Sequence, residues 1–343
     1  MDRQFPPEIV QLIVKASLDR HDPTDPSGRH ALGRYPILLK YSLINSTWRC
    51  ASEPSLYEWV IVHSEAYALS FLQTVQSRGG TIEGVKNISI LAVCFTGTSS
   101  STVARLLKSV PRVVHVTLMY GEVDCGDLAR LRDLRRLSMF AVRINGSAAP
   151  PTPCFPALRQ MFVGHQSTIT QSARLFFTPQ TLPQLRHLDI GDLTVTPTLV
   201  PLFPQLQSIN VGPEHYRLLP AATSLRLITV PFSSSERSKM FSRLSSLPFP
   251  PFIWIDCLWA FPTTQLAETL GDLLASTNKG LRVIILRDRG IDDTIESLIQ
   301  QLGTRGIRVE RQEEDVDGPI EAMERILAEE QQAEEEKSNA AAA

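Results

Sequence analysis

The chain has 343 residues, of which 43% are hydrophobic and 20% charged, and its formal net charge is −2. This length can bury a continuous core, and no segment approaches the roughly 18 apolar residues of a membrane span, which excludes a membrane-spanning class. The five cysteines are odd in number and lack CxxC spacing, which argues against a disulfide framework or a zinc site. No basic segment precedes an apolar run near residue 1, so we expect no secretory signal and a cytoplasmic or nuclear location.

The first expected element is a short helix within FPPEIVQLIV, residues 5–14. Pro7 suits the first helical position, and Glu8 complements the helix dipole in the first turn. Apolar residues recur at the spacing of one helical face. They are Ile9, Leu12, Ile13 and Ala16.

Two more helices are expected over residues 36–60. The second opens at Pro36, and either Asn45 or Ser46 can cap a third helix that contains Trp48. Three short helices bury little surface, so such a module gains stability from a partner that covers its apolar residues.

These segments resemble the F-box, and most of all the divergent F-box-like proteins of fungi. Family members carry a Leu-Pro-x-Glu-Ile start, a Leu-Val-Cys-Lys-x-Trp core and an Asp-Pro-x-Leu-Trp end. The matching positions are Phe5, Pro6, Glu8 and Ile9, then Leu43, Ile44 and Trp48, then Glu53, Pro54, Leu56 and Tyr57. Asn45 and Ser46 replace the Cys and Lys, and the insert at residues 21–36 exceeds the usual connection.

The resemblance implies that residues 1–62 dock on a Skp-family adaptor. The chain would then be the substrate receptor of a cullin-RING ubiquitin ligase. The adaptor-binding residues implied are Phe5, Pro6, Pro7, Glu8, Ile9, Leu12, Ile13, Leu39, Leu43, Ile44 and Trp48. The alternative is a plain N-terminal helical cap that recruits no ligase.

A repeat organises residues 63–311: an apolar residue, two variable ones, an apolar one, a variable one and an apolar one. The nine copies are Val85/Ile88/Ile90, Val113/Val116/Leu118, Leu134/Leu137/Met139, Leu158/Met161/Val163, Leu185/Leu188/Ile190, Leu206/Ile209/Val211, Leu225/Ile228/Val230, Phe252/Ile255/Cys257 and Leu281/Ile284/Leu286. Their central residues lie 19 to 29 positions apart. This grammar resembles that of leucine-rich repeats, in which each unit contributes one parallel strand and returns through a helix or loop.

The returns differ in character along the chain. Helices are expected after the serines at 99–101, after the threonines at 263–264 and after Asp292, whereas the proline-rich returns near 150–156 and 197–204 favour loops. An ordinary α/β sheet with helical crossovers is the competing architecture, but spacings of 19 to 21 residues leave little room for full crossovers.

We therefore predict an α/β chain in three parts. A short all-α F-box-like module spans residues 1–62, a leucine-rich-repeat solenoid with a curved parallel sheet spans 63–311, and an acidic, partly disordered tail spans 312–343.

The tail is strongly acidic. Residues 313–337 hold 11 acidic and 2 basic side chains, which leaves the rest of the chain at +7. Such a segment favours a solvated helix or disorder, although apolar residues could dock one or two turns. They are Ile320, Met323, Ile326 and Leu327. The tail could serve as an electrostatic partner for a basic protein or as a shield over the basic body; a merely solvating tail is the simpler interpretation.

The sequence carries no recognised catalytic motif: it has no nucleophile elbow, phosphate loop, dinucleotide fingerprint or HExxH helix. We predict no catalytic residue, no metal and no cofactor, so an unrecognised α/β enzyme is the third alternative. His187 and Asp189 fall on one side of a predicted strand, but without a nucleophile they suit a recognition surface.

The third and fifth positions of each repeat should project from the open face of the sheet and bind a protein substrate, not nucleic acid or a membrane. The predicted substrate-binding residues are Arg136, Ser138, Gln160, Phe162, His187, Asp189, Asn210, Trp254 and Asp256. Trp254 and Arg136 are expected to be the strongest contacts.

The second position is Arg in five repeats, which favours either a ladder for an acidic or phosphorylated ligand or simple solubilising charge. These residues are Arg135, Arg159, Arg186, Arg226 and Arg282.

Overall fold

The computed structural model describes most of the chain. The described residues are 5–18, 29–82, 84–91, 100–146, 150, 153–191, 196–230, 234–244, 250–256, 263–275, 280–287, 293–312 and 319–342. The chain divides into two compact units, Met1–Leu185 with Asp189–Leu202, and Arg186–Leu188 with Phe203–Ala343. Within the described segments, no helix is both long and apolar enough to cross a membrane.

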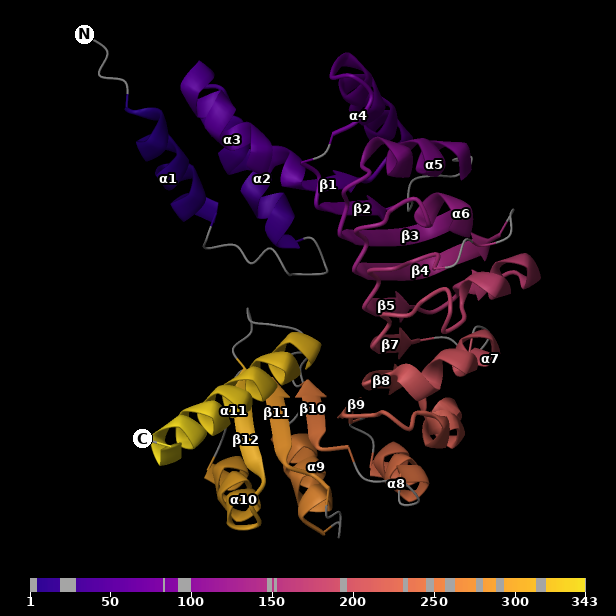
Figure 1. Ribbon diagram of the computed structural model, residues 1–343, viewed down its shortest axis with the longest axis vertical. Coiled ribbons are helices and arrows are strands. Elements are labelled where there is room, and N and C mark those ends of the chain that lie inside the picture. The colour runs from indigo at the N-terminus through magenta and orange to yellow at the C-terminus, as the bar shows by residue number, and fades with distance from the viewer. Residues whose placement is uncertain are drawn as a thin grey trace. The chain divides into compact units, whose positions relative to one another are not determined.

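Helices and strands alternate along both units (Figure 1). The elements up to residue 205 are α1 (Pro7–Leu18), α2 (Arg29–Ser42), α3 (Ser46–Glu58), β1 (Trp59–Val62), α4 (Glu65–Ser77), β2 (Asn87–Leu91), α5 (Ser100–Ser109), β3 (His115–Asp124), α6 (Cys125–Leu128), β4 (Arg136–Asn145), β5 (Gln160–Val163), β6 (Thr168–Ile169), η2 (Gln171–Phe176), β7 (His187–Ile190), α7 (Thr196–Leu199) and η3 (Val200–Gln205). The later elements are β8 (Ser208–Val211), η4 (Pro213–Ala221), β9 (Leu227–Thr229), α8 (Ser234–Leu244), β10 (Phe252–Asp256), α9 (Thr263–Ala275), β11 (Val283–Arg287), α10 (Asp293–Thr304), β12 (Arg308–Gln312) and α11 (Pro319–Ala342).

Twelve strands form one sheet in which the chain order is kept. The order is β1-β2-β3-β4-β5-β7-β8-β9-β10-β11-β12, and β6 pairs with β4. The strands pair in parallel from β1 to β5, between β4 and β6, and from β8 to β12. Sequential parallel strands joined by short helical or irregular returns are typical of leucine-rich repeats.

The predicted repeat positions form the core of the sheet. In eight of the nine copies, the residues of the apolar pattern are buried. Within these eight copies Leu225 is the exception, since it is partly exposed. Strand register places these residues in continuous rows. In the first unit one row joins Ile88 to Val116, Leu137 and Met161.

A repeated backbone contact locks one repeat to the next. The carbonyl oxygen of the second-position residue accepts hydrogen bonds from two successive amides of the following repeat. Val114 accepts from Arg135 and Arg136 at 2.7 and 3.1 Å, and Arg135 accepts from Arg159 and Gln160 at 2.9 and 3.0 Å. This contact recurs in the second unit, where Gln207 accepts from Arg226 and Leu227 at 2.7 and 2.9 Å.

The eighth copy requires a correction of two residues. Ile253, not Ile255, pairs with the central residues Ile228 and Ile284. The carbonyl of Pro251 also accepts the two amides of the next repeat, as a second-position residue does. The eighth copy is therefore Pro250/Ile253/Ile255, and Cys257, which was assigned to it, lies outside the described residues.

Helices α1, α2 and α3 form a small helical module with its own core. Val10, Val14 and Leu38 are buried, and Trp48 packs against them with its ring centroid 5.0 Å from that of Tyr41. The buried face of α1 is therefore the Val10/Val14 face, not the face of Ile9, Leu12, Ile13 and Ala16.

Two boundaries of the module bear on the sequence prediction. The side chain of Asn45 accepts a hydrogen bond from the Trp48 amide at 3.1 Å, so Asn45 is the N-cap of α3. Helix α2 begins at Arg29 and contains Pro36, so Pro36 does not open it as expected. The rest of the predicted insert, residues 21–28, lies outside the described residues.

The returns follow the helix signals closely. Helices α5, α9 and α10 begin where the serine, threonine and aspartate signals placed them. The proline-rich return after β7, expected as a loop, instead contains α7 and the 3-10 helix η3. Prolines at 197, 201 and 204 are compatible with these short helical turns because few intrahelical bonds are lost there.

Two end strands were absent from the predicted repeat. Strand β1, Trp59–Val62, pairs with β2, and strand β12, Arg308–Gln312, pairs with β11. The sheet therefore begins within the segment assigned to the helical module and reaches into the segment assigned to the tail.

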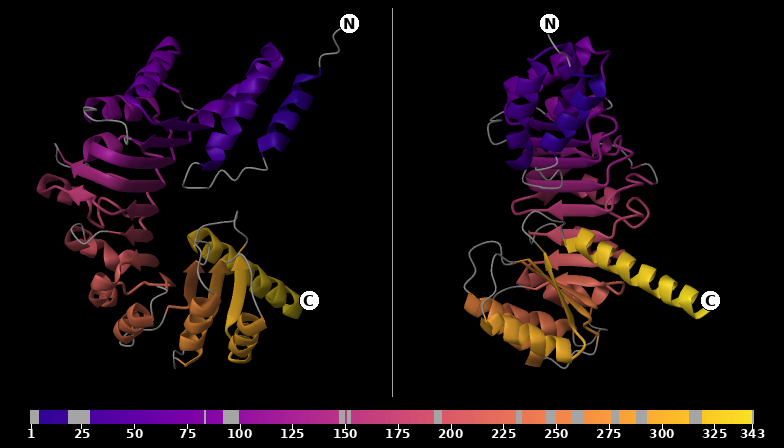
Figure 2. Two further views of the ribbon diagram at one scale, coloured as in Figure 1. Left: turned by 180° about the vertical axis from the view of Figure 1, so that it is seen from behind. Right: turned by 90° about the vertical axis from the view of Figure 1, so that its left-hand side faces the viewer.

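The acidic segment forms α11, whose first turns pack on the sheet. Ala322, Met323 and Ile326 are buried, and Leu327 packs beside them. Residues 331–338 of the same helix are exposed to solvent. Helices α9 and α10 lie on one face of β10–β12, and α11 lies on the other (Figure 2).

Candidate functional site

An exposed apolar surface lies on the helical module. We call it the module surface: Phe5, Ile9, Leu12, Leu39, Leu43 and Ile44, whose exposed fractions range from 41% to 79%. It comprises six of the eleven residues that the F-box resemblance implied. Of the others, Pro6, Pro7 and Glu8 are exposed, Ile13 is partly exposed, and Trp48 packs inside the module.

Arg78, at the end of α4, contacts the helical module. Its guanidinium donates a hydrogen bond to Glu53 of α3 and lies 4.8 Å from the ring centroid of Tyr57. The hydrogen bond to Glu53 is the largest cause that raises the pKa of Arg78. Tyr57, which stands where the F-box pattern has Trp, thus supports a contact with the repeats.

The open face of β2–β5 carries two rows of polar side chains, set by strand register. The first row is Asn87, His115, Arg136 and Gln160, and the second is Ser89, Thr117, Ser138 and Phe162. In each row the serine and asparagine side chains are buried, and the others are partly exposed. The larger side chains are therefore the groups available to a partner.

A polar contact and an aromatic pair organise this open face. Arg136 donates from Nε to Oε1 of Gln160, across β4 and β5. The ring centroids of Phe140 and Phe162 lie 4.4 Å apart, and the ring planes make an angle of 34°. A Cβ at Gly164 would come within 2.7 Å of Phe140 and 2.8 Å of Phe162, so the absence of a side chain at 164 permits this aromatic pair.

Strands β3 and β4 bend at the same level beside the aromatic pair. Tyr120 and Ala141 have φ values of 60° and 52°, in the left-handed region. The strand register skips both residues, because it pairs Met119 with Phe140 and then Gly121 with Val142. This conformation is strained for a residue as bulky as Tyr, and such strain is found at functional sites. Tyr120 is about half exposed and follows Met119, the partner of Phe140 in the strand register.

The nine predicted substrate-binding residues are distributed over both units. Arg136, Ser138, Gln160 and Phe162 lie together on β4 and β5. His187 and Asp189 lie on β7, where the two units meet in the chain; His187 is buried and Asp189 partly exposed. Asn210 is partly exposed on β8, and Asp256 ends β10, where its side chain lies outside the described residues.

Trp254 is the main departure from the prediction. It was expected as an exposed anchor on the open face, but only 2% of it is exposed, beneath the first turns of α11. The open-face neighbours of Trp254 are apolar, in contrast to the polar rows of β2–β5. They are Leu227, Phe252, Val283 and Ile285.

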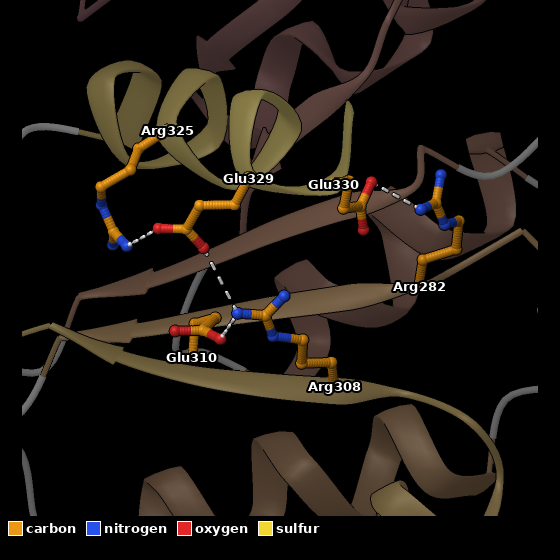
Figure 3. A network of polar contacts seen from close by, with 6 residues as sticks. All are labelled: Arg282, Arg308, Glu310, Arg325, Glu329 and Glu330. Atoms are coloured by element: carbon orange, nitrogen blue, oxygen red, sulfur yellow. Dashed lines mark hydrogen bonds and ion pairs between the residues drawn. The ribbon is translucent and has the colours of Figure 1, made fainter. Parts of the chain in front are cut away.

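The five second-position arginines remain at the surface. Arg135, Arg159, Arg226 and Arg282 are exposed, and Arg186 is partly exposed. Arg282 donates from Nη2 to Oε2 of Glu330 at 2.7 Å, so the acidic helix engages one member of this set (Figure 3).

Sequence reasoning missed three features of these surfaces. Phe140 and Tyr120 follow the apolar repeat positions and fell outside the pattern. The cover over Trp254 had a local signal: FIWI at 252–255 and VIIL at 283–286 are continuous apolar runs, which indicate strands buried on both faces.

No protein-family model matches the sequence, and no curated protein matches it. A similar solved structure is the leucine-rich repeat-containing protein LegL7 from Legionella pneumophila, with 11% sequence identity and a TM-score of 0.39 over 75% of this chain and 90% of that one. Similarity at this level adds nothing to the argument. The parallel sheet typical of leucine-rich repeats is established by the register of the chain's own strands.

Proposed function

We propose that the chain is a protein-interaction scaffold that holds a protein partner on the open face of β2–β5. The observation that carries this proposal is the registered row of His115, Arg136 and Gln160, with Phe162 in the next row. A row with one guanidinium and one imidazole, beside the partly exposed Phe162, suits a polar peptide or protein surface better than a small molecule.

Charge reversal at the centre of this row tests the proposal. Arg136→Glu removes the contact with Gln160 and inverts the charge offered to a partner. Arg132→Glu makes the same change in the exposed turn before β4 and is the matched control. Quantitative affinity purification should show partners held by the wild type and the control but lost from Arg136→Glu. Identical partner sets for all three chains, with unchanged melting temperatures, would discard the open face as the binding surface.

A second, more specific proposal concerns the helical module. Six large apolar side chains of the module are exposed to solvent, and exposed apolar residues concentrated in a small module are typical of a partner site. This supports docking on a Skp-family adaptor, so that the chain serves as substrate receptor of a cullin-RING ubiquitin ligase. Other subunits would then perform catalysis, and this chain would raise the local concentration of substrate lysines near the ligase.

The adaptor proposal is tested by co-expression with a Skp-family adaptor and size-exclusion chromatography. Ile9→Glu and Leu43→Glu place charge on exposed positions, so we expect the adaptor complex to be lost with changes in stability within about 0.5 kcal/mol. Leu69→Glu, on the exposed part of α4, is the control that should retain the complex. A folded wild-type chain that forms no complex would leave the scaffold without ligase recruitment as the function.

A further inference from the structure

The open face of β9–β11 is built differently from that of β2–β5. Its side chains form what we call the apolar floor: Leu227, Phe252, Trp254, Val283 and Ile285, each no more than 2% exposed. Strand register aligns Leu227 with Phe252 and Val283, and Trp254 with Ile285. This is therefore a continuous apolar surface on the face that carries polar side chains in the first unit.

The first turns of α11 cover the apolar floor. Ala322, Met323 and Ile326 are buried against it and Leu327 packs at its margin. Positions i, i+1, i+4 and i+5 lie on one helical face, so α11 meets the sheet through a single narrow stripe. The helix continues past this stripe into the exposed residues 331–338.

Ion pairs join glutamates of α11 to arginines of the sheet beneath it. Glu330 pairs with Arg282 at 2.7 Å, and Glu329 pairs with Arg308 at 3.6 Å and with Arg325 at 3.0 Å (Figure 3). Arg282 directly precedes β11 and Arg308 is the first residue of β12, whereas the glutamates lie on the helix. These groups are partly exposed, so salt screens them.

We propose that the apolar floor is a binding site for an acidic amphipathic helix, that α11 occupies it in cis, and that a partner helix of the same chemistry displaces α11. Helices bound in apolar grooves are recognised through anchors three or four residues apart. On this floor Met323 and Ile326 are three residues apart, and Ala322 and Ile326 are four apart. The partner motif carries apolar residues equivalent to 322, 323, 326 and 327, followed by two acidic residues equivalent to 329 and 330. The proposal does not depend on what β2–β5 or the module surface binds.

The loss of apparent affinity that α11 imposes on a partner helix can be estimated. A helix tethered by a short linker has an effective concentration on the order of 1 mM. If a free helix binds the empty floor with a Kd of about 10 μM, the tethered helix weakens its apparent affinity roughly 100-fold. Cutting the tether should remove this penalty.

The test uses the full chain with a protease recognition sequence placed within residues 313–318. A dye-labelled peptide of residues 319–342 is the probe, and fluorescence anisotropy measures its binding before and after cleavage. We expect the cut chain to exchange its own helix for the probe and to bind it roughly 100-fold more tightly than the uncut chain does. A probe with Met323→Glu and Ile326→Glu should not bind.

A charge exchange identifies the site. Arg282→Glu in the cut chain should weaken binding of the wild-type probe. A probe with Glu330→Arg should bind that variant with recovered affinity. Raising the salt from 0.05 M to 0.5 M should weaken the wild-type pair several-fold.

Four results would overturn the proposal. The cut chain could retain its helix against excess probe, or unfold on cleavage, and either result would make α11 a permanent part of the unit. Equal probe affinity for the cut and uncut chains would show that the probe binds outside the apolar floor. A dimer of the uncut chain that exchanges α11 between copies would assign the floor to a second copy of the chain.

Discussion

The guanidinium of Arg78 lies over the ring of Tyr57, 4.8 Å from its centroid, and donates to Glu53 at the same time. Arg78 is the C-cap of α4, whereas Glu53 and Tyr57 both belong to α3. One side chain therefore links the helical module to the first return helix of the repeats.

Removing this link should loosen the module without unfolding the repeats. We expect Arg78→Ala to lower the free energy of unfolding by about 1 kcal/mol, since exposed ion pairs and cation–π contacts each contribute up to about 1 kcal/mol. Arg132→Ala, in an exposed turn, is the control in urea denaturation. Equal effects of the two variants would show that the Arg78 contacts do not stabilise the chain.

The pair of Arg237 and Asp272 should behave differently from surface ion pairs. The Arg237 side chain is 1% exposed. Its Nε donates a hydrogen bond to Oδ2 of Asp272 at 2.8 Å, and the guanidinium forms an ion pair with the same carboxylate, which joins α8 to α9. Asp272→Ala leaves a buried charge without this partner and should cost about 2–3 kcal/mol, less than for a fully enclosed pair because Asp272 is partly exposed.

Arg237→Met removes the buried charge together with the pair, so its cost should be below about 1 kcal/mol. Both values are measured by urea denaturation. A larger loss for Arg237→Met than for Asp272→Ala would contradict the buried-charge account.

The thiols at 125 and 154 should resist alkylation in the native chain. Burial is the main cause that raises the pKa of Cys125, with smaller contributions from Cys154 and Asp124, and burial raises the pKa of Cys154 to about 12. A raised pKa leaves the unreactive thiol as the main form of both side chains at about pH 8.

Iodoacetamide labelling followed by peptide mass spectrometry measures this directly. Cys50 is exposed and should be modified in the folded chain, whereas Cys125 and Cys154 should react only after denaturation. Rapid native labelling of Cys125 would show that the return around α6 opens readily.

The cap of α3 should also be measurable. Asn45→Ala removes the side-chain acceptor for the Trp48 amide and should cost about 1 kcal/mol of unfolding free energy. Asn45→Asp keeps the acceptor and should cost little. If the two variants are equally destabilised, the hydrogen bond does not contribute and Asn45 acts through packing alone.

The repeat grammar was sufficient to predict nine strands and the side chains they bury, because apolar spacing is a local property. It failed at the eighth copy for a physical reason. Phe252, Ile253, Trp254 and Ile255 are all apolar, so two registers two residues apart bury similar side chains. The carbonyl of Pro251 decides between them through the amides of Arg282 and Val283.

The surface could be predicted only where a residue's surroundings come from neighbouring repeats. Arg136, Gln160 and Phe162 lie together because consecutive repeats stack in register. Trp254 is covered by Met323 and Ile326, some seventy residues later, and the repeat pattern contains no information on that contact.

The cover of the apolar floor also orders events during synthesis. Strands β9, β10 and β11 leave the ribosome before α11, so the floor is first formed without the helix that shields it. Uncovered apolar sheet is prone to association during this interval. The second unit therefore completes its folding after translation of residues 319–327, and a nascent chain paused before them is the form most in need of a chaperone.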